Sequence, residues 1–410
     1  MPISQAHPKL RSVEVIPIEE DGQRLFVVHD PTGLATSAAT VGAATMFILM
    51  LMDGKHSLEA IQQKFNQQFG KELPRHQLVD MIEQLDEAHF MDSEEFTAYF
   101  QSKVDAYRAA PARVSTDDLA SLGAQDDGLV LTIERMLAAH SRNSTRSIDR
   151  RLAGLIVPHL DFARGKSCYA DGYKSLSLTK PADRYVILGT NHFGRGTSVV
   201  ATLKDFQTPL GTTRTDRTLL AELQSRLDAD LCEHEFDHQS EHSIELQVLI
   251  LQYLLADTDY EIVPVLCPDP CGPSGTEPID GQGVDLAVFA ETLGEIIHAD
   301  DKSTIIIAGA DLSHVGMRFG DQRELDHAFL GEVEKRDREI LEIIITGDGD
   351  ALVETIIKDE NRTRFCSAGC IYALMAALPR ARRELINYHQ AVHQSSQTCV
   401  TCCAMAFWET

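Results

Sequence analysis

The strongest constraint on the fold is the alternation of short apolar runs with longer helical patterns after the first third of the chain. Four of these runs consist almost entirely of β-branched and aliphatic residues: GLIV (154–157), YVIL (185–188), EIVPVL (261–266) and TIIIAG (304–309). Uninterrupted runs of this kind are typical of strands buried on both faces, and alternation with helices favours a parallel sheet. The sequence therefore predicts an α/β domain with a central, mostly parallel sheet flanked by helices.

The first hundred residues predict a separate small unit. Two strand-like runs, Val13 to Ile18 and Leu25 to Val28, are joined across Asp21 and Gly22, a dipeptide typical of hairpin turns. Apolar residues at helical spacing then predict three helices, which cover 43–52, a segment opened by Ser57, and 77–88. A hairpin with three small helices indicates a winged-helix-like α+β domain.

The chain length and the local composition divide the protein further. At about 150 residues per domain, 410 residues favour two or three domains. The region 106–126 is small and polar, with no firm apolar period, and is typical of a linker. We therefore expect the winged-helix-like domain over 1–105, a linker region over 106–126 and the α/β domain over 127–410.

The net charge excludes one large class of partners. Acidic residues number 62 and basic residues 37, so the formal charge is −25, which disfavours binding to a phosphate backbone and hence to nucleic acid. The N-terminus has no apolar segment typical of a signal peptide. The best membrane candidate, 34–52, has only about ten strongly apolar residues, too few to span a bilayer. We expect a cytoplasmic protein without membrane contact.

In that compartment the nine cysteines are expected to be thiols, metal ligands or core residues rather than disulfides. Three of them, in TCVTCCAMAF (398–407), alternate with apolar residues and predict a buried terminal strand.

Polar residues follow three of the apolar runs, where a core strand does not need them. His159 follows the first run, His192 the second, and Asp311 with His314 the fourth. In open α/β sheets ligands bind beyond the carboxyl ends of the strands, so these side chains can converge on one pocket. Histidine is the commonest metal ligand among side chains, because its neutral ring nitrogen donates near neutral pH. A metal site is therefore expected at this edge of the sheet.

The third ligand of such a site stays open between Glu245, in SEHSIELQ, and Cys366, in TRFCSAGC. Glu241 and Glu245 are one helical turn apart, which predicts that they share a helix face with His242 beside them. A solvated acidic flank explains Glu241 equally well. Cys366 and Cys370 open a helical stretch whose dipole favours a thiolate, although buried cysteines commonly serve as small apolar residues.

From about residue 112 to the C-terminus, the chain resembles the Memo family, whose bacterial and archaeal members are known as AmmeMemoRadiSam system protein B. Eight motifs occur in sequence order: VPHLDF, RYVILGTNHFG, FQTPLGTTRTD, SEHSIELQ, YEIVPVL, GADLSHVGMRF, the CSAG segment and NYHQAVHQSSQ. The N-terminal unit resembles the PqqD-like domains, which bind peptides by adding a strand to their sheet edge. That resemblance rests on the pattern of elements and on the run FILMLMDGKHSLEAIQQKF.

The Memo resemblance implies a fold similar to that of the class III extradiol dioxygenases, which hold non-haem iron(II) with two histidines and a carboxylate. It implies that His159 and His192 are the metal histidines and that Cys366 takes the place of the carboxylate. It also implies an acid/base role for His314 with Asp311.

The motif SEHSIELQ matches the family's EHSIE segment through Glu241, His242 and Glu245. Two departures from the family put any relative's substrate in doubt here. The cysteine is often followed by Gly-Arg-His-Pro, whereas this chain has Ser-Ala-Gly-Cys at 367–370. Some relatives also have paired histidines where this chain has His192 and Phe193.

The expected function is that of a metal-dependent redox enzyme acting on a small molecule or a peptide. Iron(II) is the expected metal, with copper or zinc as alternatives, and the candidate catalytic residues are His314, Asp311, Glu245 and His242. Two other functions stay open: a zinc-dependent hydrolase with Glu245 as its base, and a non-catalytic adaptor that binds a ligand or peptide in the same pocket. In the adaptor, the hairpin edge would present a peptide to the pocket or to a radical-SAM partner.

Overall fold

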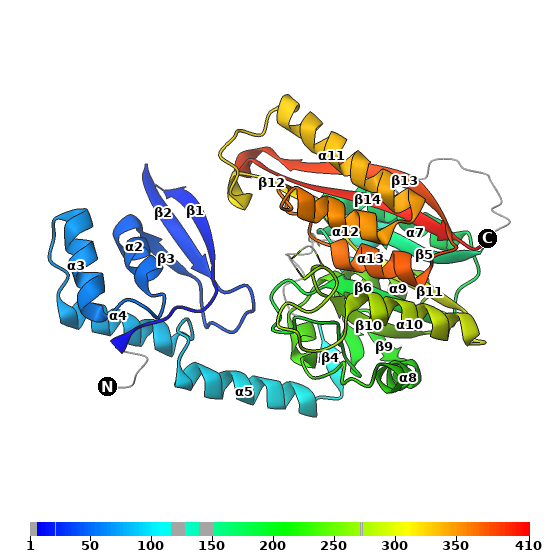
Figure 1. The fold of residues 1–410 in the computed structure, drawn as a ribbon, viewed down its shortest axis with the longest axis horizontal. Helices are drawn as coiled ribbons and strands as arrows, with labels where there is room; N and C mark the ends of the chain where they lie inside the picture. Colours follow the sequence, from blue (N-terminus) through cyan, green and yellow to red (C-terminus); the bar gives the residue numbers. More distant parts are fainter. Residues whose placement is uncertain (1–5, 21, 116–127, 139–150, 271, 273) are drawn as a thin grey trace. The chain divides into compact units, whose positions relative to one another are not determined.

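The computed structural model describes residues 6–20, 22–115, 128–138, 151–270, 272 and 274–410 (Figure 1). The chain divides into two compact units, Met1–Ala109 and Ala110–Thr410. Among the helices in these ranges, none is both long enough and apolar enough to cross a membrane.

The N-terminal unit contains a small antiparallel sheet in the order β1-β2-β3. β1 and β2 pair from Glu14 opposite His29 to Glu20 opposite Gln23, which confirms the predicted hairpin. β3 pairs with the other edge of β2, so β1 lies at the edge of the sheet. The elements of this unit are β1 (Glu14–Glu20), β2 (Gln23–His29), β3 (Ala39–Gly42), α2 (Ala43–Leu51), α3 (Leu58–Phe69), α4 (Arg75–Glu87) and α5 (Glu94–Ala109).

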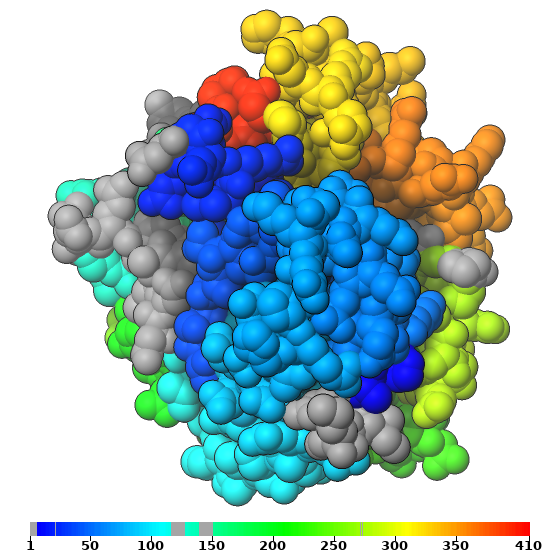
Figure 2. Space-filling view, turned by 90° about the vertical axis from the view of Figure 1, so that its left-hand side faces the viewer, coloured from blue at the N-terminus to red at the C-terminus, as the bar shows by residue number. Residues whose placement is uncertain are grey.

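The helices of this unit begin close to the predicted positions. Ser57 precedes α3, and its Oγ accepts a hydrogen bond from the backbone N–H of Ala60, so it caps the helix as its position in the sequence predicts. Apolar residues of α2, α3 and α4, among them Ile48, Ile61 and Leu78, form one core with Val28 of the sheet. Residues of α3 and α4 lie at the surface of the unit (Figure 2), and polar residues of these helices, such as Glu59 and Glu83, are exposed. The winged-helix-like assignment of this unit stays a prediction.

The C-terminal unit is built on a mixed sheet whose centre is parallel. Neighbouring strands are parallel along the path β5-β11-β6-β10-β9, which confirms the predicted central, mostly parallel sheet. The strands on this path are β5 (Leu152–Val157), β6 (Arg184–Thr190), β9 (Gly211–Thr215), β10 (Glu261–Cys267) and β11 (Thr304–Gly309). Beyond β9 lie β8 (Asp205–Thr208) and β4 (Ala112–Val114), and the short β7 (Val200–Ala201) pairs with β10.

Helices cover both faces of this sheet (Figure 1). On one face, α6 (Leu129–Ala138), α7 (Phe162–Ser177) and α9 (Ser243–Leu254) share a core with the strands. The core on the other face includes residues of α8 (Arg217–Leu227), α10 (Leu286–Ala299), α11 (His327–Thr346), α12 (Gly349–Lys358) and α13 (Ala368–Ala377). Burial on both faces explains why the strands are continuous apolar runs.

A long C-terminal hairpin extends the sheet beyond β5. It is formed by β13 (Arg382–His393) and β14 (Thr398–Trp408), and β14 also pairs with β5 and with β12 (Asp311–Gly316). Every residue of β14 is buried, including Cys399, Cys402 and Cys403. The predicted terminal core strand is confirmed.

Part of the region predicted as a linker has regular structure. Residues 106–109 complete α5, where Tyr107 is buried, and 112–114 form β4, which pairs in parallel with β8. Residues 116–126 of the predicted linker lie outside the described residues.

Candidate metal centre

Two histidines lie just beyond the carboxyl ends of strands β5 and β6, which are both neighbours of β11. His159 follows β5 and His192 follows β6, and β11 lies between these strands. The two imidazole rings meet edge to face, with centroids 4.8 Å apart. The convergence expected from the polar residues at the strand ends is therefore found for these two side chains.

Gly309, the last residue of β11, leaves room for this arrangement. A Cβ atom at this position would lie 2.8 Å from the carbonyl oxygen of Ser243, the first residue of α9. Glycine therefore allows the start of α9 to lie directly against the end of β11. The carbonyl oxygen of Gly309 lies 2.9 Å from Nδ1 of His159 and can accept its hydrogen.

Cys366 completes a three-residue cluster with these histidines. Its Sγ atom lies 3.2 Å from Nε2 of His192 and 3.7 Å from Nε2 of His159. Metal–nitrogen bonds of about 2.0–2.1 Å and metal–sulfur bonds of about 2.3 Å give a nitrogen–sulfur separation of about 3.5 Å in a tetrahedral site. The two observed distances bracket this value, so the sulfur already has the spacing of a metal ligand to each of the two nitrogens.

Backbone hydrogen bonds hold the segment that carries Cys366. The N–H of Cys366 donates to the carbonyl oxygen of Leu312 at 3.1 Å, and the N–H of His314 donates to Thr363 at 2.7 Å. The segment 363–366 therefore lies alongside β12.

The Nδ1 atoms of both histidines are held by acceptors, which directs their Nε2 atoms toward Cys366. His159 faces the carbonyl of Gly309, and Nδ1 of His192 lies 3.0 and 3.1 Å from the two carboxylate oxygens of Glu241. Metal-bound histidines in proteins have the same arrangement, in which a carbonyl or carboxylate accepts the hydrogen of the non-ligating nitrogen. The residues present thus fit a metal ion.

The position of Glu241 differs from the prediction. α9 begins at Ser243, so Glu241 precedes the helix and does not share a helix face with Glu245. Glu241 turns back to accept hydrogen bonds from the backbone N–H groups of Ser243, at 2.8 Å, and His192, at 3.2 Å. Its side chain acts as a local capping acceptor and as the partner of His192.

The charges of His192, Glu241 and Cys366 shift one another's pKa values. Burial alone would raise the pKa of Glu241, but the charge of His192 outweighs it, so the pKa of Glu241 lies well below its ordinary value. Burial would lower the pKa of His192, yet Glu241 and Cys366 hold it well above its ordinary value. Burial would likewise raise the pKa of the Cys366 thiol, but His192 and His159 hold it well below the ordinary range. The cluster favours a thiolate.

Asp311 lies against His159. Its Oδ1 accepts a hydrogen bond from the backbone N–H of His159 at 3.2 Å, and its Oδ2 lies 3.5 Å from Nε2 of the same residue. Burial would lower the pKa of His159, but the charges of Asp311 and Cys366 outweigh it and raise the pKa to about 9. The pKa of Asp311 itself is raised, mainly by burial.

His314 occupies a different environment from the one its motif suggested. It lies within the strand β12 rather than in a loop after β11, at an irregularity in the pairing with β14. Its Nδ1 lies 3.2 Å from the carbonyl oxygen of Leu312, and its ring meets Phe319 edge to face. The charge of His314 opposes the rise in the pKa of Asp311, whereas the direct contacts of the Asp311 carboxylate described above are with His159.

Glu245 lies outside the cluster, in a buried ion pair. Its Oε2 is 2.5 Å from Nη1 of Arg113, both side chains are almost fully buried, and Ser115 donates to the other oxygen. Burial raises the pKa of Glu245 although Arg113 opposes the shift. Arg113 and Ser115 already bind both oxygens of the carboxylate that the hydrolase alternative needs as a base.

Sequence reasoning missed Arg113 and Ser367. Besides Glu245, Arg113 binds the carbonyl oxygens of His238 and Glu241, both at 3.1 Å, and so holds the turn that carries Glu241. A glutamate in the apolar stretch of α9 requires a cationic partner, but nothing in the sequence says which one. The Oγ of Ser367 accepts from Thr190 and from the backbone of Asp311.

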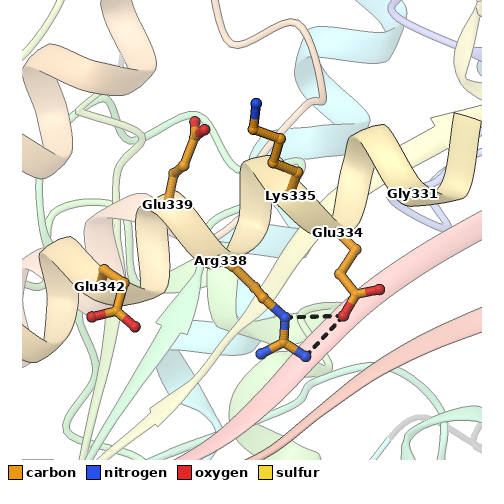
Figure 3. A pocket seen from close by; sticks show the side chains of 6 residues that line it. All are labelled: Gly331, Glu334, Lys335, Arg338, Glu339 and Glu342. Atoms are coloured by element: carbon orange, nitrogen blue, oxygen red, sulfur yellow. Dashed lines mark hydrogen bonds and ion pairs between the residues drawn. The ribbon is translucent and has the colours of Figure 1, made fainter.

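Two surface pockets elsewhere contain none of the predicted site residues. One runs along α11 and is lined by charged side chains, with Glu334 and Arg338 forming an ion pair one turn apart (Figure 3). The other, beside the segment 196–200, is polar and acidic and includes Asp228, Asp230 and Asp280.

His242 brings a third imidazole to the cluster. Its ring stacks on that of His192, with centroids 5.2 Å apart, and meets the ring of His159 at 5.6 Å. The donor atoms of His159, His192 and His242 all lie within 4.8 Å of one another. Burial, together with His192 and His159, outweighs the opposing charge of Glu241 and lowers the pKa of His242 to about 4.

The fold and the cluster define a class: an α/β protein with a histidine and cysteine site at the carboxyl edge of a parallel sheet. Residues 129–406 match the sequence profile of the family described as Memo-like protein. The chain therefore belongs to the Memo-like family.

The chain is similar to several curated proteins and to one solved structure. A MEMO1 family protein of Aquifex aeolicus is 26% identical over 357 residues, which cover 87% of each chain. One of Thermus thermophilus is 25% identical over 342 residues, covering 83% of this chain and 94% of the relative. One of Methanosarcina barkeri is 29% identical over 244 residues, covering 58% and 80%. The crystal structure of an uncharacterized protein from Escherichia coli K12 is 16% identical, with a TM-score of 0.35, and covers 62% of this chain and 99% of that one.

Proposed function

We propose that the protein binds one transition-metal ion through His159, His192 and Cys366 and works as a metal-dependent oxidoreductase. The observation that carries this proposal is the approach of the Cys366 sulfur to the Nε2 atoms of both histidines, at 3.2 and 3.7 Å. Two imidazoles and a thiolate suit iron, copper and zinc. Iron(II) is our first choice because of the resemblance to the class III extradiol dioxygenases.

The residues around the site have separate roles in this proposal. Glu241 and the carbonyl of Gly309 orient the two imidazoles, and the lowered pKa of Cys366 keeps the sulfur in the form that binds metals. A bound iron or copper ion would supply the electron-transfer chemistry that protein side chains lack. His314 would exchange a proton with a small-molecule or peptide substrate, with Asp311 as its proposed partner.

The test is the metal content of protein purified without oxygen and without a chelating tag, measured by mass spectrometry. We expect near one equivalent of iron or copper in the wild type and loss of that metal in His192→Ala and Cys366→Ser. The matched control is Cys232→Ser, which changes a partly buried cysteine that takes no part in the cluster. Metal that is absent from the wild type, or unchanged in both site variants, would contradict the proposal.

A zinc-dependent hydrolase is a weaker proposal. It would use the same ligands, but Glu245, the base that the sequence offered, is paired with Arg113 and Ser115. The oxidoreductase proposal needs no such base.

Peptide binding by the N-terminal unit is a second candidate function, and the edge position of β1 favours it. Among the described residues β1 pairs only with β2, so one side of β1, from Val15 to Glu19, has backbone groups available for an added strand. A peptide, or a radical-SAM partner that carries one, is the proposed occupant. Deletion of 1–105 should abolish its capture in a pull-down, and capture that survives the deletion would contradict the idea.

A further inference from the structure

His242 is the most exposed of the three histidines. Its side chain is 43% exposed, compared with 3% for His159 and 19% for His192. Its Nδ1 lies 3.5 Å from Oε1 of Glu241, too far for a good hydrogen bond, whereas Nδ1 of His192 has oxygen neighbours at 3.0 and 3.1 Å. Nδ1 of His242 is therefore held less tightly than Nδ1 of His192.

The distance of His242 from the other donors is the second observation. Two nitrogens bound to one tetrahedral metal ion are about 3.3 Å apart when each metal–nitrogen bond is about 2.0–2.1 Å. The donor atoms of the three histidines lie within 4.8 Å of one another, so each of these separations exceeds the ligand spacing by at most about 1.5 Å. Cys366 already has the spacing of a ligand to the other two.

We propose that His242 is a displaceable fourth ligand of the site, and this inference rests on the proposed metal binding. His159, His192 and Cys366 would hold the ion permanently, and His242 would occupy the remaining position until an external ligand replaces it. Four protein ligands are typical of closed sites, and three are typical of sites that bind a substrate or a small molecule. Movement of His242 would convert one kind of site into the other.

The experiment uses cobalt(II) as a spectroscopic probe in the full chain. Cobalt affinity and the visible absorption of the bound ion are measured for the wild type, His242→Ala and Phe193→Ala. Phe193 is the matched control, because its half-exposed ring also lies beside that of His192, with centroids 5.8 Å apart, but offers no donor atom. Circular dichroism verifies that each variant is folded.

In His242→Ala we expect cobalt affinity to fall about tenfold to a hundredfold, with a changed visible spectrum. Added imidazole should restore the wild-type spectrum, because it can occupy the position that the side chain left. Azide should bind more tightly to His242→Ala than to the wild type, because it no longer competes with a protein ligand. Phe193→Ala should behave as the wild type does.

The inference would be overturned by a His242→Ala variant whose affinity and spectrum equal those of the wild type. A loss that imidazole does not reverse, or that Phe193→Ala shares, would also overturn it, because such a loss reflects local structure and not ligation. Failure of the wild type itself to bind cobalt would instead reject the proposed metal site, and the inference with it. Cobalt binding that the wild type shows and that Cys366→Ser loses would support the proposed metal site whatever the result for His242→Ala.

Discussion

The two carboxylate oxygens of Glu241 lie 3.1 and 3.0 Å from Nδ1 of His192, on the side of the ring opposite Cys366. Partners of this kind fix the orientation of a metal-binding imidazole, and their loss commonly lowers metal affinity 10- to 100-fold. We therefore expect Glu241→Gln to lower iron or copper affinity by about this factor, measured by competition with a chelator. Glu295→Gln changes an exposed glutamate and serves as the control. Equal affinities in the two variants would contradict this role of Glu241.

Arg113→Met should destabilise the C-terminal unit. The substitution leaves the buried carboxylate of Glu245 without its cationic partner, a change that commonly costs about 3–5 kcal/mol of unfolding free energy. Urea unfolding can be followed through the fluorescence of Trp408, the single tryptophan, which is buried in β14.

The control for this prediction is Arg214→Met, because Arg214 forms an exposed ion pair with Asp259 at 2.7 Å. Exposed pairs contribute about 0–1 kcal/mol, so the urea midpoint should hardly change. Similar shifts in the two variants would refute the importance of the buried pair.

His314→Ala should separate metal binding from turnover. The His314 side chain belongs to β12 and does not supply a donor to the cluster of three histidines, so metal content should stay at the wild-type value. Loss of a general acid/base commonly slows a reaction about 10²- to 10⁴-fold. Oxygen uptake with catechol-like and peptide substrates measures turnover. His393→Ala changes an exposed histidine and is the control. Parallel loss of metal and turnover would reject the assigned role.

Asp30→Asn tests the stability of the N-terminal unit as a function of pH. Burial alone would raise the pKa of Asp30, but hydrogen bonds from Thr32 and the charge of Arg11 outweigh it, and the pKa is lowered. A lowered pKa means that the stabilisation is complete above the unfolded-state value of about 3.9 and is lost as the pH falls below it. The backbone N–H groups of Leu34 and Ala35 also donate to Asp30.

Near pH 7 we expect Asp30→Asn to lower the unfolding free energy of this unit by about 1.5–3 kcal/mol, measured by calorimetry. The difference from the wild type should shrink as the pH falls from 4 toward 3. A constant difference over that range would show that the charge of Asp30 is not the cause. The Trp408 signal of the C-terminal unit should not change.

The strands and the positions of His159 and His192 could be predicted because both depend on local sequence. A buried parallel strand has a continuous apolar run, and a polar residue just beyond it has no role in the core. The same reasoning placed His314 after β11, but it lies in β12, since pairing with β14 extends the chain there. Pairing with a strand so distant in sequence leaves no local signal.

The partners of the site residues could not be predicted for a related reason. The spacing of Glu241 and Glu245 fits one helix face, yet α9 begins after Glu241 and the two carboxylates face different partners. Arg113, which holds both segments, comes from a part of the chain with no apolar period and is 128 residues from Glu241. Contacts across such separations depend on the assembled sheet.

The position of β11 between β5 and β6 has a thermodynamic consequence for ion uptake. Adjacent strands are about 4.8 Å apart, so the hydrogen-bonded sheet, and not a loop, sets the separation of the segments that carry His159 and His192. The conformational entropy that bringing these two donors together costs is lost when the chain folds, so ion binding adds no further cost of this kind. Much of the affinity of such a site is thus determined by how firmly three neighbouring strands hold one another.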